Sequence, residues 1–162
     1  MRFPPPCSLL FCLLGAVVAP PGAAAGQEPS GHEFGVQAIT VLEDPVWAGG
    51  GAYGAWRPGG KTRLAATLGV GRLDAKVSGR GELLAHFLLS PGRVRGVTLY
   101  GVGGIAGVVG PRDQGYLVLG LGLEQAPGAR SGWVVEAGVG GGVRILAGWR
   151  WRWLHAARLA AP

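Results

Sequence analysis

The sequence predicts an all-β protein, an eight-stranded antiparallel up-and-down transmembrane β-barrel that follows a cleaved signal peptide. Short alternating segments separated by turn residues fill the chain after residue 26, which indicates strands. Glycine supplies 32 of the 162 residues and argues against helices, since an interior glycine costs a helix about 1 kcal/mol relative to alanine. Most segments are near the roughly 9–11 residues that a tilted transmembrane strand needs. Their even number and short turns favour a closed barrel.

The first 25 residues have the features of a secretory signal peptide. Arg2 gives a positive start, residues 9–18 an apolar run, and residues 23–25 a small-residue cleavage site. The run is too short to cross a bilayer as a helix. The chain after the signal divides into a short segment at 26–32, the barrel at 33–153 and a C-terminal tail at 154–162.

Composition excludes several classes of protein. Cys7 and Cys12 both lie in the signal segment, so the exported chain has no cysteine and no disulfide. The hydrophobic fraction of 48% argues against disorder. The formal net charge is +6, but the basic residues form no run, so we expect no nucleic-acid partner.

Two kinds of turn alternate along the chain. Pro-Gly pairs at 58, 91 and 127 precede a basic residue, and turns with an aspartate lie between them. In a meander, alternate turns fall at opposite ends of the sheet, so one end is Pro-Gly and basic and the other bears aspartate. The expected strands are 33–42, 46–57, 62–72, 77–89, 96–108, 115–125, 132–140 and 142–153.

The alternation separates a bulky apolar face from a face of small and charged residues. An eight-stranded barrel is only just wide enough for side chains to fill it, so rows of leucine and tryptophan would overfill it. We therefore expect the bulky face to meet lipid and the tryptophans to join an aromatic girdle. The expected membrane-facing residues are Leu117, Leu119, Leu121, Leu123, Trp149, Trp151 and Trp153.

Charged side chains on the small face would point into the lumen, where buried charges need partners. The expected lumen charge cluster, a structural feature, is Arg63, Arg80, Glu82, Glu124, Glu136, Arg144 and Arg150. Arg152 shares the face of Arg150 and points into the lumen or its mouth. The faces of 46–57 and 96–108 stay open, because glycine or alanine occurs on both.

The last hairpin allows a specific expectation. Glu136 and Arg144 belong to the same face, so pairing requires an odd number of loop residues. A three-residue glycine loop at 140–142 satisfies this condition. Gly138 then lies opposite Arg144, and Glu136 becomes its diagonal neighbour, which predicts a lumenal contact between the two charges.

The signal peptide, alternating strands such as GYLVLGLGLE and the last strand GVRILAGWRWRW resemble the small eight-stranded outer-membrane proteins of the OmpA/OmpX type. This resemblance implies a bacterial outer-membrane location and a bilayer as partner. It also implies insertion by the outer-membrane assembly machinery, which reads an aromatic-ended last strand, here ending at Trp153. Both termini and the Pro-Gly turns would then be periplasmic. The chain departs from the family in its short loops and in the residues after Trp153.

These observations favour a non-enzymatic outer-membrane barrel with an envelope structural or surface-interaction role. One alternative is a secreted, soluble, lipocalin-like barrel that binds a small apolar ligand, with the leucine face inside. A less favoured alternative is a lipid-modifying enzyme. Glu82, His86 and Ser90 would lie on the same face of one strand and could be imagined as a catalytic group. Residues four apart on a strand are about 13 Å apart, however, which is beyond hydrogen-bonding reach.

No catalytic residue, cofactor site, metal ligand or small-molecule substrate is therefore expected. The glycine motif from Gly101 to Ala106 matches a dinucleotide-binding pattern, but that pattern needs a following helix, which Gly107, Gly110 and Pro111 oppose. The histidines at 32, 86 and 155 show no metal-ligand spacing.

Overall fold

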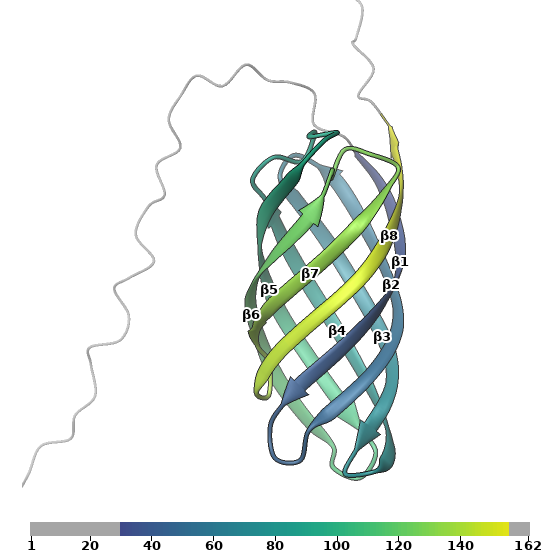
Figure 1. Cartoon of the computed structure of the whole chain (residues 1–162), viewed down its shortest axis with the longest axis vertical. Coiled ribbons are helices and arrows are strands. Elements are labelled where there is room, and N and C mark those ends of the chain that lie inside the picture. Colours follow the sequence, from purple (N-terminus) through teal and green to yellow (C-terminus); the bar gives the residue numbers. More distant parts are fainter. Residues whose placement is uncertain (1–29, 156–162) are drawn as a thin grey trace, which may run out of the picture.

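The computed structural model describes residues 30–155 and shows a closed antiparallel barrel (Figure 1). No helix in this part of the chain is long and apolar enough to cross a membrane. The eight strands are β1 (Ser30–Leu42), β2 (Trp47–Gly59), β3 (Thr62–Leu73), β4 (Lys76–Leu88), β5 (Val97–Val109), β6 (Gln114–Gln125), β7 (Ser131–Val139) and β8 (Val143–His155). The expected signal peptide and nearly all of the expected tail lie outside the described residues.

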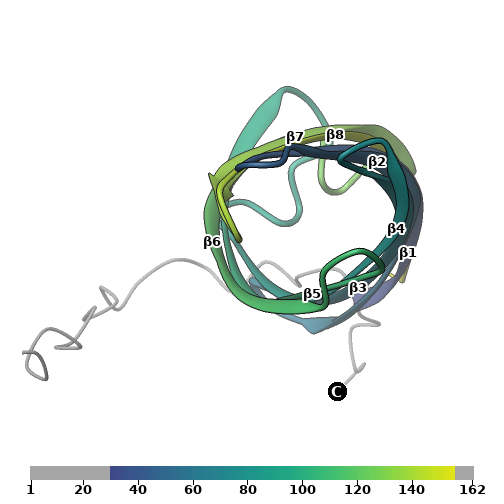
Figure 2. The same ribbon diagram turned by 90° about the horizontal axis from the view of Figure 1, so that it is seen from below.

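Each strand pairs with its neighbours in sequence, and β8 returns to pair with β1, which closes the ring seen in Figure 2. The closing register runs from Ser30 opposite His155 to Leu42 opposite Val143. The all-β, eight-stranded antiparallel fold expected from the sequence is confirmed. The expected limits of the barrel, 33 and 153, are too narrow, because β1 and β8 extend each other by pairing beyond both positions.

The barrel has two chemically different ends. The terminal end, uppermost in Figure 1, contains the start of β1, the end of β8 and the connections 60–61, 89–96 and 126–130. The distal end contains the connections 43–46, 74–75, 110–113 and 140–142. The two kinds of turn lie at opposite ends, as the alternation predicts, although Pro58 and Gly59 are within the end of β2.

The connections differ in one respect from the sequence-based expectation. The connection 89–96 is one residue longer at each end than the connection 90–95 that the expected strands leave, and it folds over the terminal end of the barrel, where Pro91 is buried. Its carbonyl oxygen accepts a hydrogen bond of 3.4 Å from Nη1 of the buried Arg57. At the distal end, the glycine loop 140–142 is as expected, with Val139 opposite Val143 and Gly138 opposite Arg144.

Burial is inverted relative to a water-soluble protein. Large aliphatic and aromatic side chains are exposed on the outside, including Leu117 at 75% and Trp153 at 61%. Arginine and glutamate side chains are buried inside. The lipocalin-like arrangement, with the leucine row filling the barrel, is therefore not the one that this chain adopts.

The structure shows which face of β2 and of β5 points into the barrel, a question that the sequence leaves open. In β2, Trp47, Tyr53 and Arg57 point inward and Trp56 points outward. In β5, Tyr100 points inward and lies opposite Gly122 of β6. A Cβ atom on Gly122 would collide with the Tyr100 ring. Glycine at this position thus allows a large ring to lie flat across the inner wall.

Candidate functional site

The lumen concentrates the ionisable side chains of the barrel. Six arginines and four glutamates are buried there, each no more than 3% exposed. The buried charged residues are Glu33, Arg57, Arg63, Arg80, Glu82, Glu124, Glu136, Arg144, Arg150 and Arg152. All seven residues of the expected lumen charge cluster are among them. The expected membrane-facing residues all lie on the exterior.

One group of charges lies toward the terminal end. This terminal cluster consists of Glu33, Arg57, Arg63, Glu124, Arg150 and Arg152. Arg63 donates from Nη1 to Glu124 Oε2 at 2.9 Å and also to Glu33 Oε2 at 3.3 Å. Arg152 Nη2 donates to the same Glu124 oxygen at 3.1 Å, and Arg57 pairs with Glu33. Two carboxylates are thus shared among four guanidinium groups.

A second group lies toward the distal end. This distal cluster consists of Arg80, Glu82, Glu136 and Arg144. Arg144 binds Glu82 through two hydrogen bonds of 2.7 and 3.1 Å. Its third nitrogen, Nη1, donates to Glu136 Oε2 at 2.8 Å, which is the contact that the last hairpin predicts. Arg80 donates to Glu82 at 2.8 Å and to the Gly140 carbonyl oxygen at 3.0 Å, which ties the glycine loop to the interior.

Aromatic rings connect the two clusters. Tyr100 reaches across Gly122 and donates its hydroxyl to Glu136 Oε1 at 2.6 Å. Arg150 donates to the same oxygen at 2.8 Å, and its guanidinium carbon lies 4.2 Å from the centre of the Tyr53 ring. Glu136 therefore accepts hydrogen bonds from β5 and, through Arg144 and Arg150, from β8. Glu136 thus joins three strands, β5, β7 and β8.

The interior also contains an apolar cluster, in which the inward-facing Leu84 and Leu88 are packed. Both belong to a buried cluster with valine, isoleucine and aromatic side chains, among them Val41, Trp47 and Leu146. Trp47 also packs close to Gly49 and Gly71 and lies 5.9 Å from the Arg80 guanidinium carbon.

Sequence reasoning missed Glu33, Arg57, Tyr53 and Tyr100 as interior residues. For Glu33 a signal was present, since Phe34 and Val36 alternate with Glu33, Gly35 and Gln37. For Arg57, Tyr53 and Tyr100 the signal was weak, because glycine and alanine occupy both faces of their strands.

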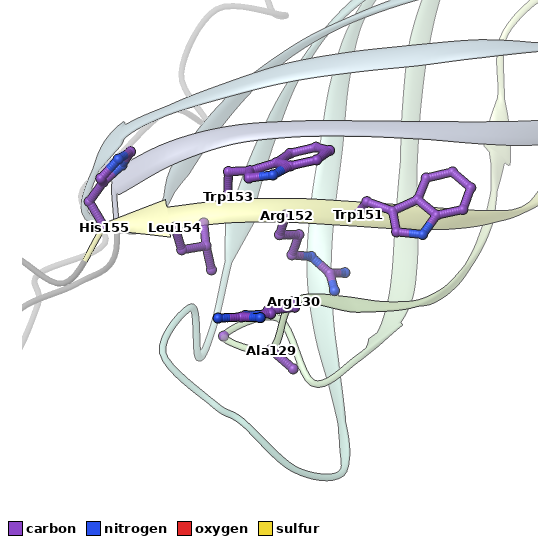
Figure 3. Close-up of a pocket in the computed structure, with 8 residues that line it drawn as sticks. Ala129, Arg130, Trp151, Arg152, Trp153, Leu154 and His155 are labelled. Atoms are coloured by element: carbon purple, nitrogen blue, oxygen red, sulfur yellow. The ribbon is translucent and has the colours of Figure 1, made fainter.

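A recess of about 710 Å³ lies at the terminal end of the barrel, between the end of β8 and the connection 126–130. In Figure 3, Arg152 and Leu154 leave β8 on the side opposite Trp153, and Arg130 faces Arg152 from the neighbouring connection. β7 begins at Ser131, opposite Trp151. The last residues of β8 thus extend past β7, which leaves this side of the strand open to the recess.

The residues considered for catalysis do not form a shared site. Glu82 is bound to Arg80 and Arg144, and His86 Nδ1 accepts a hydrogen bond of 2.9 Å from Arg63 Nε. Ser90 is exposed in the connection 89–96. The glycine motif from Gly101 lies in the middle of β5 rather than before a helix. Between residues 30 and 155, no three His, Cys, Asp or Glu side chains are grouped to hold a metal ion.

Replacing Glu136 tests the energetic role of the buried network. Glu136→Gln should lower the free energy of unfolding by about 3–5 kcal/mol, because it leaves buried arginine charge uncompensated. Asp74→Asn, at an exposed turn residue, should change it by less than about 0.5 kcal/mol. Urea unfolding of the two variants measures both effects, and equal stabilities would contradict an energetic role for the network.

Replacing Gly122 tests the packing of Tyr100. Gly122→Ala should destabilise the barrel by about 1–3 kcal/mol, because the new methyl group displaces the Tyr100 ring and its bond to Glu136. Gly101→Ala is the matched control, since a Cβ there meets no atom within 4 Å. A Gly122→Ala variant as stable as Gly101→Ala would show that the ring position does not matter.

Comparisons with known proteins support the fold. No family model and no curated protein sequence matches the chain. Among solved structures, the chain is similar to the crystal structure of the N-terminal β-barrel domain of Pseudomonas aeruginosa OprF, with a TM-score of 0.54 and 15% identity. The match covers 78% of this chain and 99% of that one. At this identity the similarity concerns the fold alone, which is a closed antiparallel barrel of eight strands.

Proposed function

We propose that this protein is a non-enzymatic barrel of the bacterial outer membrane with a structural or surface-interaction role. The observation that carries the proposal is the inverted burial, with leucine, valine and tryptophan outside and ten charged side chains inside. In water such an exterior would aggregate, because monomeric soluble proteins rarely expose large continuous apolar patches. In lipid it is the stable arrangement.

The strand lengths support insertion. Five of the eight strands have 13 residues, which extend about 43 Å along the strand at roughly 3.3 Å per residue. With a tilt of about 40°, this corresponds to a height of roughly 33 Å, enough to cross a hydrocarbon core of about 25–30 Å. Most backbone groups need no lipid partner, because every strand pairs with both of its neighbours and the ring is closed; the unpaired residues lie at strand ends.

The positions of the exterior aromatic side chains indicate how deeply the barrel would lie in the membrane. They all lie at the middle of their strands or toward the terminal end: Phe34, Trp56, Phe87, Trp133, Trp149, Trp151 and Trp153. Aliphatic residues such as Leu42, Val77 and Val143 occupy the distal part of the exterior. We therefore place one aromatic girdle, at the membrane interface next to the terminal end.

Orientation and assembly follow from the OmpA-type fold as part of the proposal. Both described termini lie at one end and would be periplasmic, with the aspartate-bearing distal connections outside the cell. The outer-membrane assembly machinery would insert the chain and read β8, whose exterior ends in Trp151 and Trp153. The short distal connections leave little surface for a receptor or an adhesin, which favours a structural role in the envelope.

Membrane fractionation tests the location directly. The protein should stay in the membrane fraction after washing with salt or alkali and should dissolve only in detergent. Its gel migration should shift on boiling, because a closed barrel resists unheated detergent. Release by salt or alkali would contradict insertion and would support a soluble secreted protein.

Charged substitutions at two depths test the membrane-facing surface. Leu119 and Val109 are equally exposed, at 63% and 62%, but Leu119 is in the middle of β6 and Val109 at the distal end of β5. In bilayers, Leu119→Arg should cost about 2–4 kcal/mol of unfolding free energy and Val109→Arg about 0–1 kcal/mol. Urea unfolding in lipid vesicles measures both. Two equally small effects would mean that water, rather than lipid, surrounds the barrel.

Tryptophan depth gives a second test. Variants that keep one tryptophan and replace the other five by phenylalanine can be reconstituted in vesicles of lipids brominated at different depths. Trp149, in the middle of β8, should be quenched most by deep bromine atoms and Trp153 by shallow ones. Trp47, which is buried in the lumen, is the control and should be quenched weakly. Equal quenching of Trp47 and Trp149 would contradict the assigned faces.

A further inference from the structure

The charges buried in the barrel do not balance. Six arginines face four glutamates in the interior of the described chain, so the arginines exceed the carboxylates by two. His86 adds no positive charge, because its Nδ1 atom accepts a hydrogen bond from Arg63 and therefore carries no proton. Arginine does not lose its proton inside proteins. The two excess charges must therefore be compensated in another way.

The excess belongs to the terminal cluster. The distal cluster has two arginines and two glutamates, whereas the terminal cluster has four arginines and two glutamates. Arg150 also binds Glu136 of the distal cluster, at 2.8 Å. This shared contact distributes the imbalance but does not remove it.

Several guanidinium N–H groups of the terminal cluster have no acceptor among the described residues. Within residues 30–155, Arg63 Nη2, Arg150 Nε and Arg152 Nη1 have neither a hydrogen-bond nor an ion-pair partner, although all three side chains are buried. Ordered water could satisfy these N–H groups. Water brings no negative charge, however, so it leaves the electrostatic cost of the two excess cations in place.

The recess at the end of β8 lies beside this cluster and is the nearest solvent-filled space to it, although the side chains of the cluster are themselves buried. Arg152 lines the recess, as Figure 3 shows. Its Nη2 atom donates a hydrogen bond to Glu124 of the terminal cluster. Arg130 and His155 lie at the same recess and are exposed. The connections of the terminal end carry Lys61, Arg93, Arg95 and Arg130 and no acidic residue. The electrostatic field of these four basic side chains raises the concentration of anions near the terminal end.

We propose that the terminal cluster binds a small inorganic anion, of the kind of chloride or phosphate, which enters through the recess beside Arg152. The anion accepts hydrogen bonds from the unpartnered guanidinium groups and compensates the excess positive charge. A lipid headgroup does not suit the site, because the arginines lie inside the ring and the connection 89–96 covers the terminal end. The proposal is independent of the membrane role, since it depends on the interior alone.

Stability in different salts tests the proposal on the full barrel, folded in detergent micelles. Sodium chloride and sodium gluconate at equal ionic strength screen charges equally, but gluconate is too large for the site. Chloride at about 100 times its dissociation constant should raise the urea midpoint by roughly 1 M over gluconate. Sodium phosphate should give a similar rise if phosphate also fits. Equal midpoints in chloride, phosphate and gluconate would overturn the proposal.

Arg152→Gln separates an anion site from an ordinary ion pair. The variant removes one excess charge, so it should lose most of the chloride effect and be at least as stable as the unmodified barrel in gluconate. If Arg152 only stabilises Glu124, the variant will be destabilised equally in both salts, and the proposal fails. Arg80→Gln is the control from the balanced cluster and should keep the full chloride effect. Loss of the effect in Arg80→Gln would likewise count against the assigned site.

Bromide diffraction locates the anion without relying on a variant. Crystals soaked in sodium bromide should show an anomalous peak within hydrogen-bonding distance of Arg152. Bromide peaks only on the surface would overturn the proposal. Glu28, outside the described residues, is the other potential counter-charge. If Glu28→Gln gains a chloride effect that the unmodified chain lacks, the carboxylate of Glu28 compensates the arginines and the anion site does not exist.

Discussion

The pairing of buried arginines with four carboxylates is the interaction on which the rest of the barrel depends. The ladder hydrogen bonds join each strand only to its two neighbours, and they leave the cross-section of the ring free to flatten. Glu136 accepts bonds from Tyr100 of β5 and from Arg144 and Arg150 of β8. Arg63 of β3 joins Glu33 of β1 to Glu124 of β6 across the lumen. These contacts, together with the apolar cluster of the interior, fix the distance between opposite walls.

Glycine makes this interior possible. A ring of eight strands has little room for aromatic side chains, yet Tyr53, Tyr100 and Trp47 all point inward. Tyr100 fits because it lies over Gly122, and Trp47 because it lies against Gly49 and Gly71. Some of the glycines that argue against helices in the sequence therefore also have a packing role, since Gly122 and Gly71 leave room for the ring of a neighbouring strand.

The parts of the structure that depend on local alternation could be predicted from the sequence. The outward row from Leu117 to Leu123 and the contact between Glu136 and Arg144 need only the period of two and one loop length. The remaining partners depend on how far each strand is displaced along its neighbour around the whole ring. Arg63 and Glu124 are 61 residues apart in the sequence, and no local pattern assigns them to each other. Arg57 was hidden for another reason, because glycine or alanine occupies both faces of its strand and the alternation does not identify the inner face.

The buried charged clusters also hold the connections at the two ends of the barrel, and these two ends differ in charge. Arg57 holds the connection 89–96 over the terminal end through the Pro91 carbonyl oxygen, and Arg80 holds the glycine loop at the distal end through Gly140. Each cap is therefore tied to one of the two clusters. The connections at the terminal end are basic and lie beside the exterior tryptophans, whereas four of the five charged residues in the distal connections are acidic. A bilayer with anionic headgroups attracts the basic and aromatic end more strongly than the acidic one. The excess of buried arginines and the basic connections therefore lie at the same end of the barrel.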